Sequence, residues 1–130
     1  MFARLFAPTL EVSAHCDLPC GVYDPAQARI EAESIKAIIA KVADNDDPDF
    51  RTRAIMIKEQ RSELVKHHLW VLWTDYFKPP HVEQFPQLHD LFWRATKAAG
   101  DAKKSNDEAD AQKLLDLIDE IAEIFAETKK

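Results

Sequence analysis

Residues 24–48 read DPAQARIEAESIKAIIAKVADNDDP and predict one complete helix together with the start of the next. Each end of this stretch carries an Asp-Pro pair, in which the aspartate caps a helix and the proline suits its first turn. Between the two pairs, apolar residues recur every three or four positions and define one inward face: Ala28, Ala32, Ile35, Ile39 and Val42. The polar run 44–47 ends the first helix, so the chain is expected to turn there and to begin a second helix at Asp47-Pro48.

The second predicted helix is long and ends near Phe77. Lys78-Pro79-Pro80 stops it, because prolines donate no backbone hydrogen bond. Its expected inward face consists of Phe50, Ala54, Ile57, Leu64 and Val71, with Arg61 and His68 in two further places of the same stripe.

Two more helices are predicted after the prolines. The third starts near Pro86 and is expected to bury Leu88, Leu91, Phe92, Ala95 and Ala99. Residues 100–106 are expected to form a polar turn, in which Ser105 and Glu108 make a capping box for the fourth helix. The fourth helix is expected to bury Leu114, Ile118, Ile121 and Phe125.

The composition agrees with one compact helical domain. The chain has 130 residues, 46% of them hydrophobic, and only 2 glycines, which favours helices over a sheet rich in turns. Four amphipathic helices with short connections predict an all-α fold, an antiparallel up-down four-helix bundle. The net charge of −6 argues against nucleic acid as a partner, and no apolar run approaches the roughly 18 residues of a membrane span. We therefore expect a soluble protein.

Two N-terminal segments remain outside the predicted bundle: a leader, residues 1–14, and a hook, residues 15–24. Val12-Ser13-Ala14 has the small residues of a cleavage site, but the apolar part before it is too short for a convincing secretory signal. The hook begins His15-Cys16-Asp17-Leu18-Pro19-Cys20 and therefore holds one imidazole and both thiols of the chain within six residues. A strained disulfide, or a zinc site completed by His67, His68 or His81, would also account for these residues.

Cleavage after Ala14 would give the hook a different chemistry. The free amine of His15, the amide nitrogen of Cys16 and the Cys16 thiolate are then contiguous, and Cys20 supplies a second thiolate. These donors form a planar set, with the His15 imidazole as an axial ligand. Planar coordination by nitrogen donors indicates Ni(II) or Cu(II), and ionised amide and thiolate donors make a higher oxidation state accessible.

Four stretches of the sequence resemble the nickel-containing superoxide dismutases: HCDLPCGVYDP at 15–25, IKEQRSELVKHH at 57–68, DYFKPPH at 75–81 and FAETKK at 125–130. The resemblance implies that a protease removes residues 1–14 as a propeptide and that residues 15–130 form the mature enzyme. It also implies one nickel ion per subunit at His15, Cys16 and Cys20. The reaction implied is disproportionation of superoxide to oxygen and hydrogen peroxide by Ni(II)/Ni(III) cycling, in a homohexamer of a bacterial cytoplasm.

Four residues are expected to support this site. A hairpin turn near Asn45 places Glu31 and Arg61 at similar heights on neighbouring helices, where they either orient the His15 imidazole or form a plain salt bridge. The same geometry places Tyr76 beside the hook. Tyr23 and Tyr76 are expected either to flank the metal and gate access to it, or simply to pack against each other.

The remaining aromatic side chains and histidines are expected to be structural. Trp70, Trp73 and Trp93 are assigned to the core or to subunit contacts, and His67, His68, His81 and His89 to packing. Two other functions remain open at this point. One is a metal carrier or sensor that uses the same hook without turnover, and the other is a helical interaction module without a metal.

Overall fold

The computed structural model describes residues 20–130, which contain helices and no strand. The main helices are α1 (Ala26–Ala43), α2 (Pro48–Val71), α4 (Leu88–Lys104) and α5 (Glu108–Glu127). A π-helical turn, η2 (Leu72–Tyr76), continues α2, and a short helix, α3 (Pro79–Gln84), precedes α4.

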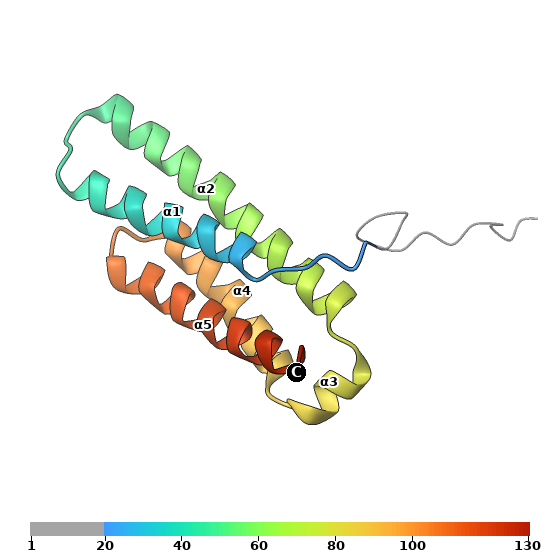
Figure 1. The fold of residues 1–130 in the computed structure, drawn as a ribbon. Coiled ribbons are helices and arrows are strands. Elements are labelled where there is room, and N and C mark those ends of the chain that lie inside the picture. The colour runs from blue at the N-terminus through green and yellow to red at the C-terminus, as the bar shows by residue number, and fades with distance from the viewer. Residues whose placement is uncertain (1–19) are drawn as a thin grey trace, which may run out of the picture.

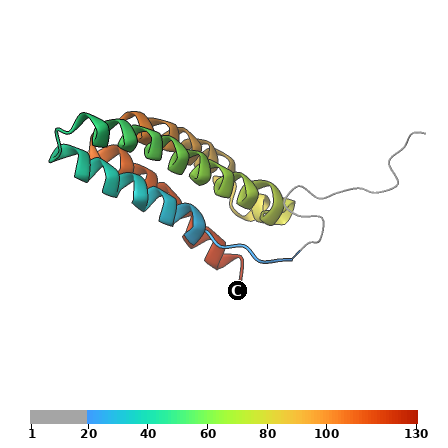
Figure 2. The ribbon, with the colours of Figure 1, turned by 90° about the horizontal axis from the view of Figure 1, so that it is seen from above.

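The four long helices form the predicted up-down bundle. Helix α1 packs against α2 and α5, and α4 packs against the same two helices, whereas α1 and α4 barely touch (Figure 1). The turns between α1 and α2 and between α4 and α5 lie at one end of the bundle. The start of α1, η2, α3 and the C-terminus lie at the other end, as both ribbon views show (Figures 1 and 2). The hook predicted at residues 15–24 therefore joins the bundle at the end that holds η2 and the C-terminus.

Both predicted Asp-Pro starts are confirmed. Asp24 Oδ1 accepts a hydrogen bond of 2.8 Å from the Ala26 amide, and Asp47 Oδ1 accepts one of 3.2 Å from the Asp49 amide. These carboxylates satisfy amides of the first turn that no helical carbonyl reaches. Every residue of the predicted inward face of α1 is buried.

The predicted turn at 100–106 is wrong. Helix α4 continues through Gly100 to Lys104, because its apolar stripe extends through Ala98, Ala99 and Ala102, all of which are buried. The cap of α5 is Asp107, whose Oδ1 accepts from the Ala109 amide at 2.9 Å. Ser105 does not cap the helix; its Oγ accepts from the Asp107 amide instead.

The predicted inward face of α2 is shifted from the observed one. Phe50, Ile57, Leu64 and Val71 lie half-buried at the edge of the bundle, together with Arg61 and His68. The buried positions are Ala54, Lys58, Ser62, Val65 and Leu69. Two of these are polar, so a search for apolar periodicity passes over them.

Lys58 and Ser62 are buried because their polar atoms are hydrogen-bonded. Ser62 Oγ donates to the Ala99 carbonyl at 2.8 Å. Lys58 Nζ donates to the Ser105 carbonyl at 2.6 Å and to Asn106 Oδ1 at 3.0 Å, beyond the end of α4. Burial lowers the pKa of Lys58 from its usual 10.5. These contacts fix the middle of α2 against α4 and the turn that follows it.

Helix α3 was not predicted. The tandem prolines end the long helix as expected, but they also occupy the first turn of α3, where a missing amide costs nothing. The amide of Lys78, the residue before this helix, donates to His81 Nδ1 at 3.1 Å. Within residues 20–130, no helix combines the length and the apolar character that crossing a membrane requires.

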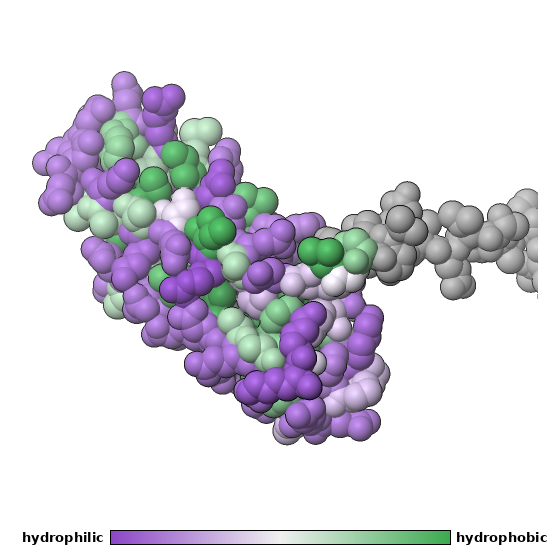
Figure 3. All heavy atoms as spheres, viewed as in Figure 1, coloured by the Kyte–Doolittle hydropathy of each residue, from purple (hydrophilic) through white to green (hydrophobic). Residues whose placement is uncertain are grey.

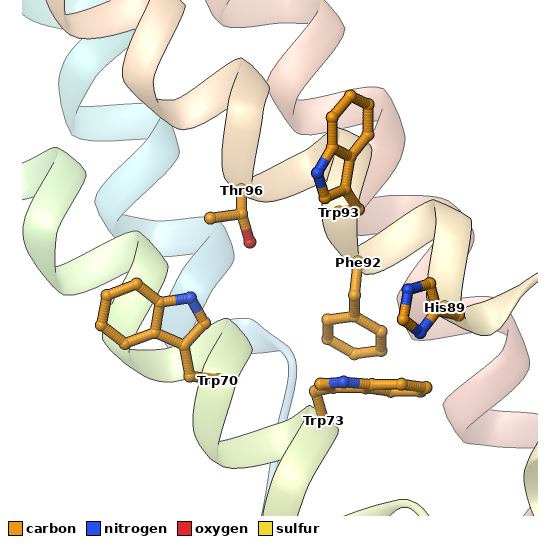
Figure 4. A pocket seen from close by; sticks show the side chains of 6 residues that line it. All are labelled: Trp70, Trp73, His89, Phe92, Trp93 and Thr96. Atoms are coloured by element: carbon orange, nitrogen blue, oxygen red, sulfur yellow. The ribbon is translucent and has the colours of Figure 1, made fainter.

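Two of the three tryptophans do not lie in the core. Trp70 is 49% exposed and Trp93 is 60% exposed, whereas Trp73 packs against the core. Together with His89, Phe92 and Thr96 they line a groove of about 230 Å³ between α2 and α4 (Figure 4). Of the two predicted places, the core therefore holds only Trp73, and subunit contacts stay a prediction for Trp70 and Trp93.

Candidate metal centre

Cys20 is the only predicted metal ligand among the described residues. His15 and Cys16 lie outside them, as do the leader, its expected cleavage after Ala14, and Pro19. Cys20 is exposed and its thiol is free. The Val22 amide donates toward Cys20 Sγ at 3.4 Å, and the thiol points to the Val22 carbonyl at 4.0 Å, so both contacts hold the side chain against the turn that follows it.

The turn after Cys20 depends on a glycine. Gly21 has a φ of +69°, in the left-handed region that side chains with a Cβ adopt only at a cost. No atom lies within 4 Å of the position that a Cβ on Gly21 would occupy, so the requirement comes from the backbone and not from crowding. The left-handed residue turns the chain from Cys20 into Tyr23 and the start of α1.

Tyr23 and Tyr76 come together directly after this turn, as predicted. Their ring centroids lie 5.6 Å apart, with the planes inclined by 55°, and both rings pack against the core. Tyr23 follows Cys20 by three residues in the sequence. Tyr76 is the last residue of η2, in which the Phe77 amide bonds to the Leu72 carbonyl five residues back, at 3.0 Å. Such π-helical turns occur frequently at functional sites, because the wider turn redirects the side chains that follow.

Glu31 and Arg61 also meet. Arg61 Nη1 lies 2.9 Å from Glu31 Oε2, and the carboxylate is the more buried partner, with 16% of its side chain exposed against 36% for Arg61. The predicted height of the two residues is therefore confirmed.

His68 adds a titratable group to this pair, which the sequence analysis treated as structural. Burial lowers the pKa of His68 from its usual 6.5, the charge of the neighbouring His67 lowers it further, and the charge of Glu31 opposes both. The interaction with Glu31 follows from the positions of both residues at the α1–α2 interface.

We expect acid to destabilise the fold through His68. Its folded-state pKa lies below the unfolded value of 6.5, so the unfolded chain binds the proton first and stability is lost as pH falls below 6.5. Urea unfolding between pH 7.5 and 5 should show this loss, and the His68→Gln variant should show a flatter profile. The exposed His89→Gln variant is the matched control and should keep the wild-type slope; an unchanged slope in His68→Gln would contradict the assignment.

The donor groups predicted for the hook suit a nickel ion. Two thiolates and an imidazole, with a terminal amine if the chain is cleaved before His15, would be a soft and nitrogen-rich set of the kind that Ni(II) accepts. Among residues 20–130, no three His, Cys, Asp or Glu side chains are grouped so that they could hold a metal ion. Cys20, free and exposed, is the described residue that such a site would use.

Comparison with known proteins agrees with the site. The family model of nickel-containing superoxide dismutases matches residues 10–129. The chain is 65% identical over 130 residues to "Superoxide dismutase [Ni]" of Streptomyces coelicolor and 66% identical to that of Streptomyces seoulensis, with 100% of this chain and 99% of each relative covered.

Solved structures agree as well. The native structure of a nickel superoxide dismutase superposes with a TM-score of 0.87 at 66% identity, covering 89% of this chain and 100% of the other. A crystal structure with nickel ligation of the oxidised state gives 0.86 at 66% identity, with 88% and 98% covered. These matches extend over the helices, the Cys20 turn and the tyrosine pair, and this chain belongs to the family of nickel-containing superoxide dismutases.

Proposed function

We propose that this chain is the precursor of a nickel-dependent superoxide dismutase, which converts two superoxide anions and two protons to oxygen and hydrogen peroxide. The observation that carries this function is the family match over residues 10–129 of a chain in which the free Cys20 thiol precedes the paired Tyr23 by three residues. Nickel, when bound, supplies the one-electron redox chemistry by moving between Ni(II) and Ni(III).

The mature enzyme in this proposal is residues 15–130, after a protease removes residues 1–14. Residues 15–130 make up 89% of the chain, the same share that covers the whole of the native solved relative. Cleavage would leave His15 with a free amine, and its amine and imidazole, the amide and thiolate of Cys16, and the thiolate of Cys20 would hold the nickel ion. The donor chemistry of these groups, not their placement, is the support for this assignment.

Glu31 and Arg61 take the role of positioning residues for the His15 imidazole. Their ion pair is half-buried and bridges α1 and α2, so it is stiffer than an exposed pair between flexible side chains. Groups that hydrogen-bond a metal-binding histidine fix its ring and its tautomer. Tyr23 and Tyr76 would flank the opening through which superoxide and water reach the site.

Attraction of the anionic substrate has to be local, because the chain as a whole carries a net charge of −6. Lys129 Nζ lies 4.9 Å from the Tyr76 ring centroid, and the exposed Lys78 follows Tyr76 by two residues. These two cations would offset the acidic surface where superoxide enters.

Assembly as a homohexamer in the cytoplasm completes the proposal. Large apolar side chains are exposed on the isolated chain, among them Ile30, Ile55, Met56, Trp70 and Trp93. On the face drawn in Figure 3 hydrophobic residues are interspersed with hydrophilic ones. Tryptophan and methionine side chains, such as the exposed Trp70, Trp93 and Met56, are enriched in contacts between subunits. Mass photometry of the mature protein would show the hexamer, or a smaller species that contradicts it.

We expect Arg61→Ala to lower dismutase activity more than nickel content, because the substitution would free the His15 imidazole without removing a thiolate that would hold the nickel ion. Loss of such a supporting contact commonly costs about 10- to 100-fold in activity or metal affinity. Superoxide decay and nickel content are measured on the same sample. Lys103→Ala, which removes the α2–α4 bridge to Glu59 near the opposite end of the bundle, is the matched control. If both variants behave alike, the Glu31–Arg61 pair is only a structural bridge.

Native mass spectrometry tests the function itself, because it reports the mature N-terminus and the metal together. The enzyme requires a chain that begins at His15, one nickel ion per subunit and rapid superoxide decay. A carrier would exchange its nickel readily and show little turnover. A helical interaction module would need neither cleavage nor metal.

A further inference from the structure

The hydroxyl group of Tyr76 is bound by a residue close to the C-terminus. Tyr76 Oη lies 2.6 Å from Thr128 Oγ1, and Thr128 Oγ1 in turn donates to the Phe125 carbonyl at 2.7 Å. A threonine hydroxyl has a single proton. Since that proton is given to the Phe125 carbonyl, the proton between the two hydroxyls must come from Tyr76. The hydrogen bonds therefore run in one direction, from Tyr76 through Thr128 to the end of α5.

The same end of α5 also holds the Tyr76 ring. The Phe125 ring lies 4.5 Å away, centroid to centroid, and Lys129 Nζ lies 4.9 Å from the Tyr76 centroid. On the α3 side, His81 stacks on Tyr76 at 5.8 Å with nearly parallel planes. Tyr76 is thus held by elements distant in the sequence, and Thr128 makes the one hydrogen bond that the described residues provide to its hydroxyl.

We propose that Thr128 is a positioning residue of the dismutase reaction, which fixes the Tyr76 hydroxyl and commits its proton. This inference rests on the proposed function, in which Tyr76 stands beside the nickel hook. With its proton directed to Thr128, Tyr76 Oη has only acceptor capacity left. It is then suited to receive a hydrogen bond from water or from protonated peroxide, and it cannot donate to a superoxide anion unless the bond to Thr128 opens.

Thr128→Val removes the hydroxyl and keeps the shape of the side chain, whereas Thr128→Ser keeps the hydroxyl. In the mature, nickel-loaded enzyme we expect Thr128→Val to change kcat/KM by about 3- to 10-fold, the range that loss of one hydrogen bond produces, and Thr128→Ser to restore it. Thr52→Val is the matched control: the Thr52 hydroxyl also bonds a carbonyl of its own helix, at 2.9 Å, but lies at the opposite end of the bundle.

A double-mutant cycle separates positioning from packing. In a Tyr76→Phe background there is no hydroxyl for Thr128 to hold, so adding Thr128→Val should leave kcat/KM unchanged. If Thr128→Val acts equally in both backgrounds, it acts through the end of α5 and not through Tyr76, and the proposal is overturned. Equal activity of Thr128→Val and the wild type would also overturn it.

A readout independent of nickel keeps the inference apart from the proposed function. The chain has only 2 tyrosines, so ¹³Cζ-labelled tyrosine gives two NMR signals, and Tyr76→Phe identifies them. In the nickel-free full chain, Thr128→Val should shift the Tyr76 signal and Thr128→Ser should not. An unmoved signal contradicts the hydrogen bond even if the enzyme is active. If the Tyr76 signal moves in Thr128→Val but the nickel-loaded wild-type protein has no dismutase activity, the hydrogen bond stands and the proposed function is contradicted instead.

Discussion

Cys16→Ser and Cys20→Ser are each expected to reduce superoxide decay to the rate of the nickel-free protein while the helices remain intact. A serine hydroxyl does not ionise near neutral pH and is a hard donor, so it replaces neither thiolate in a planar nickel site. Cys20 is exposed and belongs to no helix, so its replacement removes no core contact. Dismutase activity, nickel content and far-ultraviolet circular dichroism should be measured on the same sample.

The nickel-free wild-type protein is the reference for this experiment. Both serine variants should match it in activity and match the loaded wild type in helicity. Full activity in either variant would remove that cysteine from the metal site, whatever the family match implies.

A chain extended by one residue before His15 is expected to lose most of its activity. The loss should exceed that caused by removing a supporting contact, which is about 10- to 100-fold. With Ala14 attached, the His15 nitrogen is an amide, whose lone pair is delocalised and whose deprotonation is unfavourable in water. The site loses its terminal amine, although the thiolates can still bind nickel. The full precursor is expected to be as inactive as the one-residue extension.

The control for this prediction is the same molecule before and after cleavage. A specific protease site placed directly before His15 allows superoxide decay to be followed as the extension is removed from nickel-loaded protein. Activity should rise in step with the mass that marks a free His15. Equal rates before and after cleavage would show that the amine is dispensable and that the planar site proposed for His15, Cys16 and Cys20 is wrong.

Much of the fold could be predicted from the sequence because most of its signals are local. The Asp-Pro starts of α1 and α2 and the inward face of α1 depend on neighbouring residues only, and all were confirmed. The errors occur where a distant partner decides. Lys58 is buried because the turn after α4 supplies its hydrogen-bond acceptors. Helix α4 continues past Gly100, where a turn was predicted, because its next alanines still face the core.

The candidate site also contains contacts that could be predicted from the sequence and contacts that could not. The hairpin between α1 and α2 is short, so the contact of Glu31 with Arg61 could be predicted from their positions along it. The approach of Tyr23 to Tyr76 followed from the same hairpin. The partners of Tyr76 at the end of α5 could not be predicted, because they depend on how α5 packs at the far side of the bundle and on the π-helical turn that redirects Tyr76.

The shared location of the hook and the C-terminus restricts how this protein can be handled in the laboratory. An affinity tag before His15 would block the amine, and a tag after Lys130 would start two residues from Thr128, at the same end of the bundle (Figures 1 and 2). The turn at 105–107 is also unsuitable, because it supplies the acceptors of Lys58. Surface attachment, dyes and purification handles therefore belong at Asp44, directly after α1, where the side chain is exposed at the opposite end of the molecule.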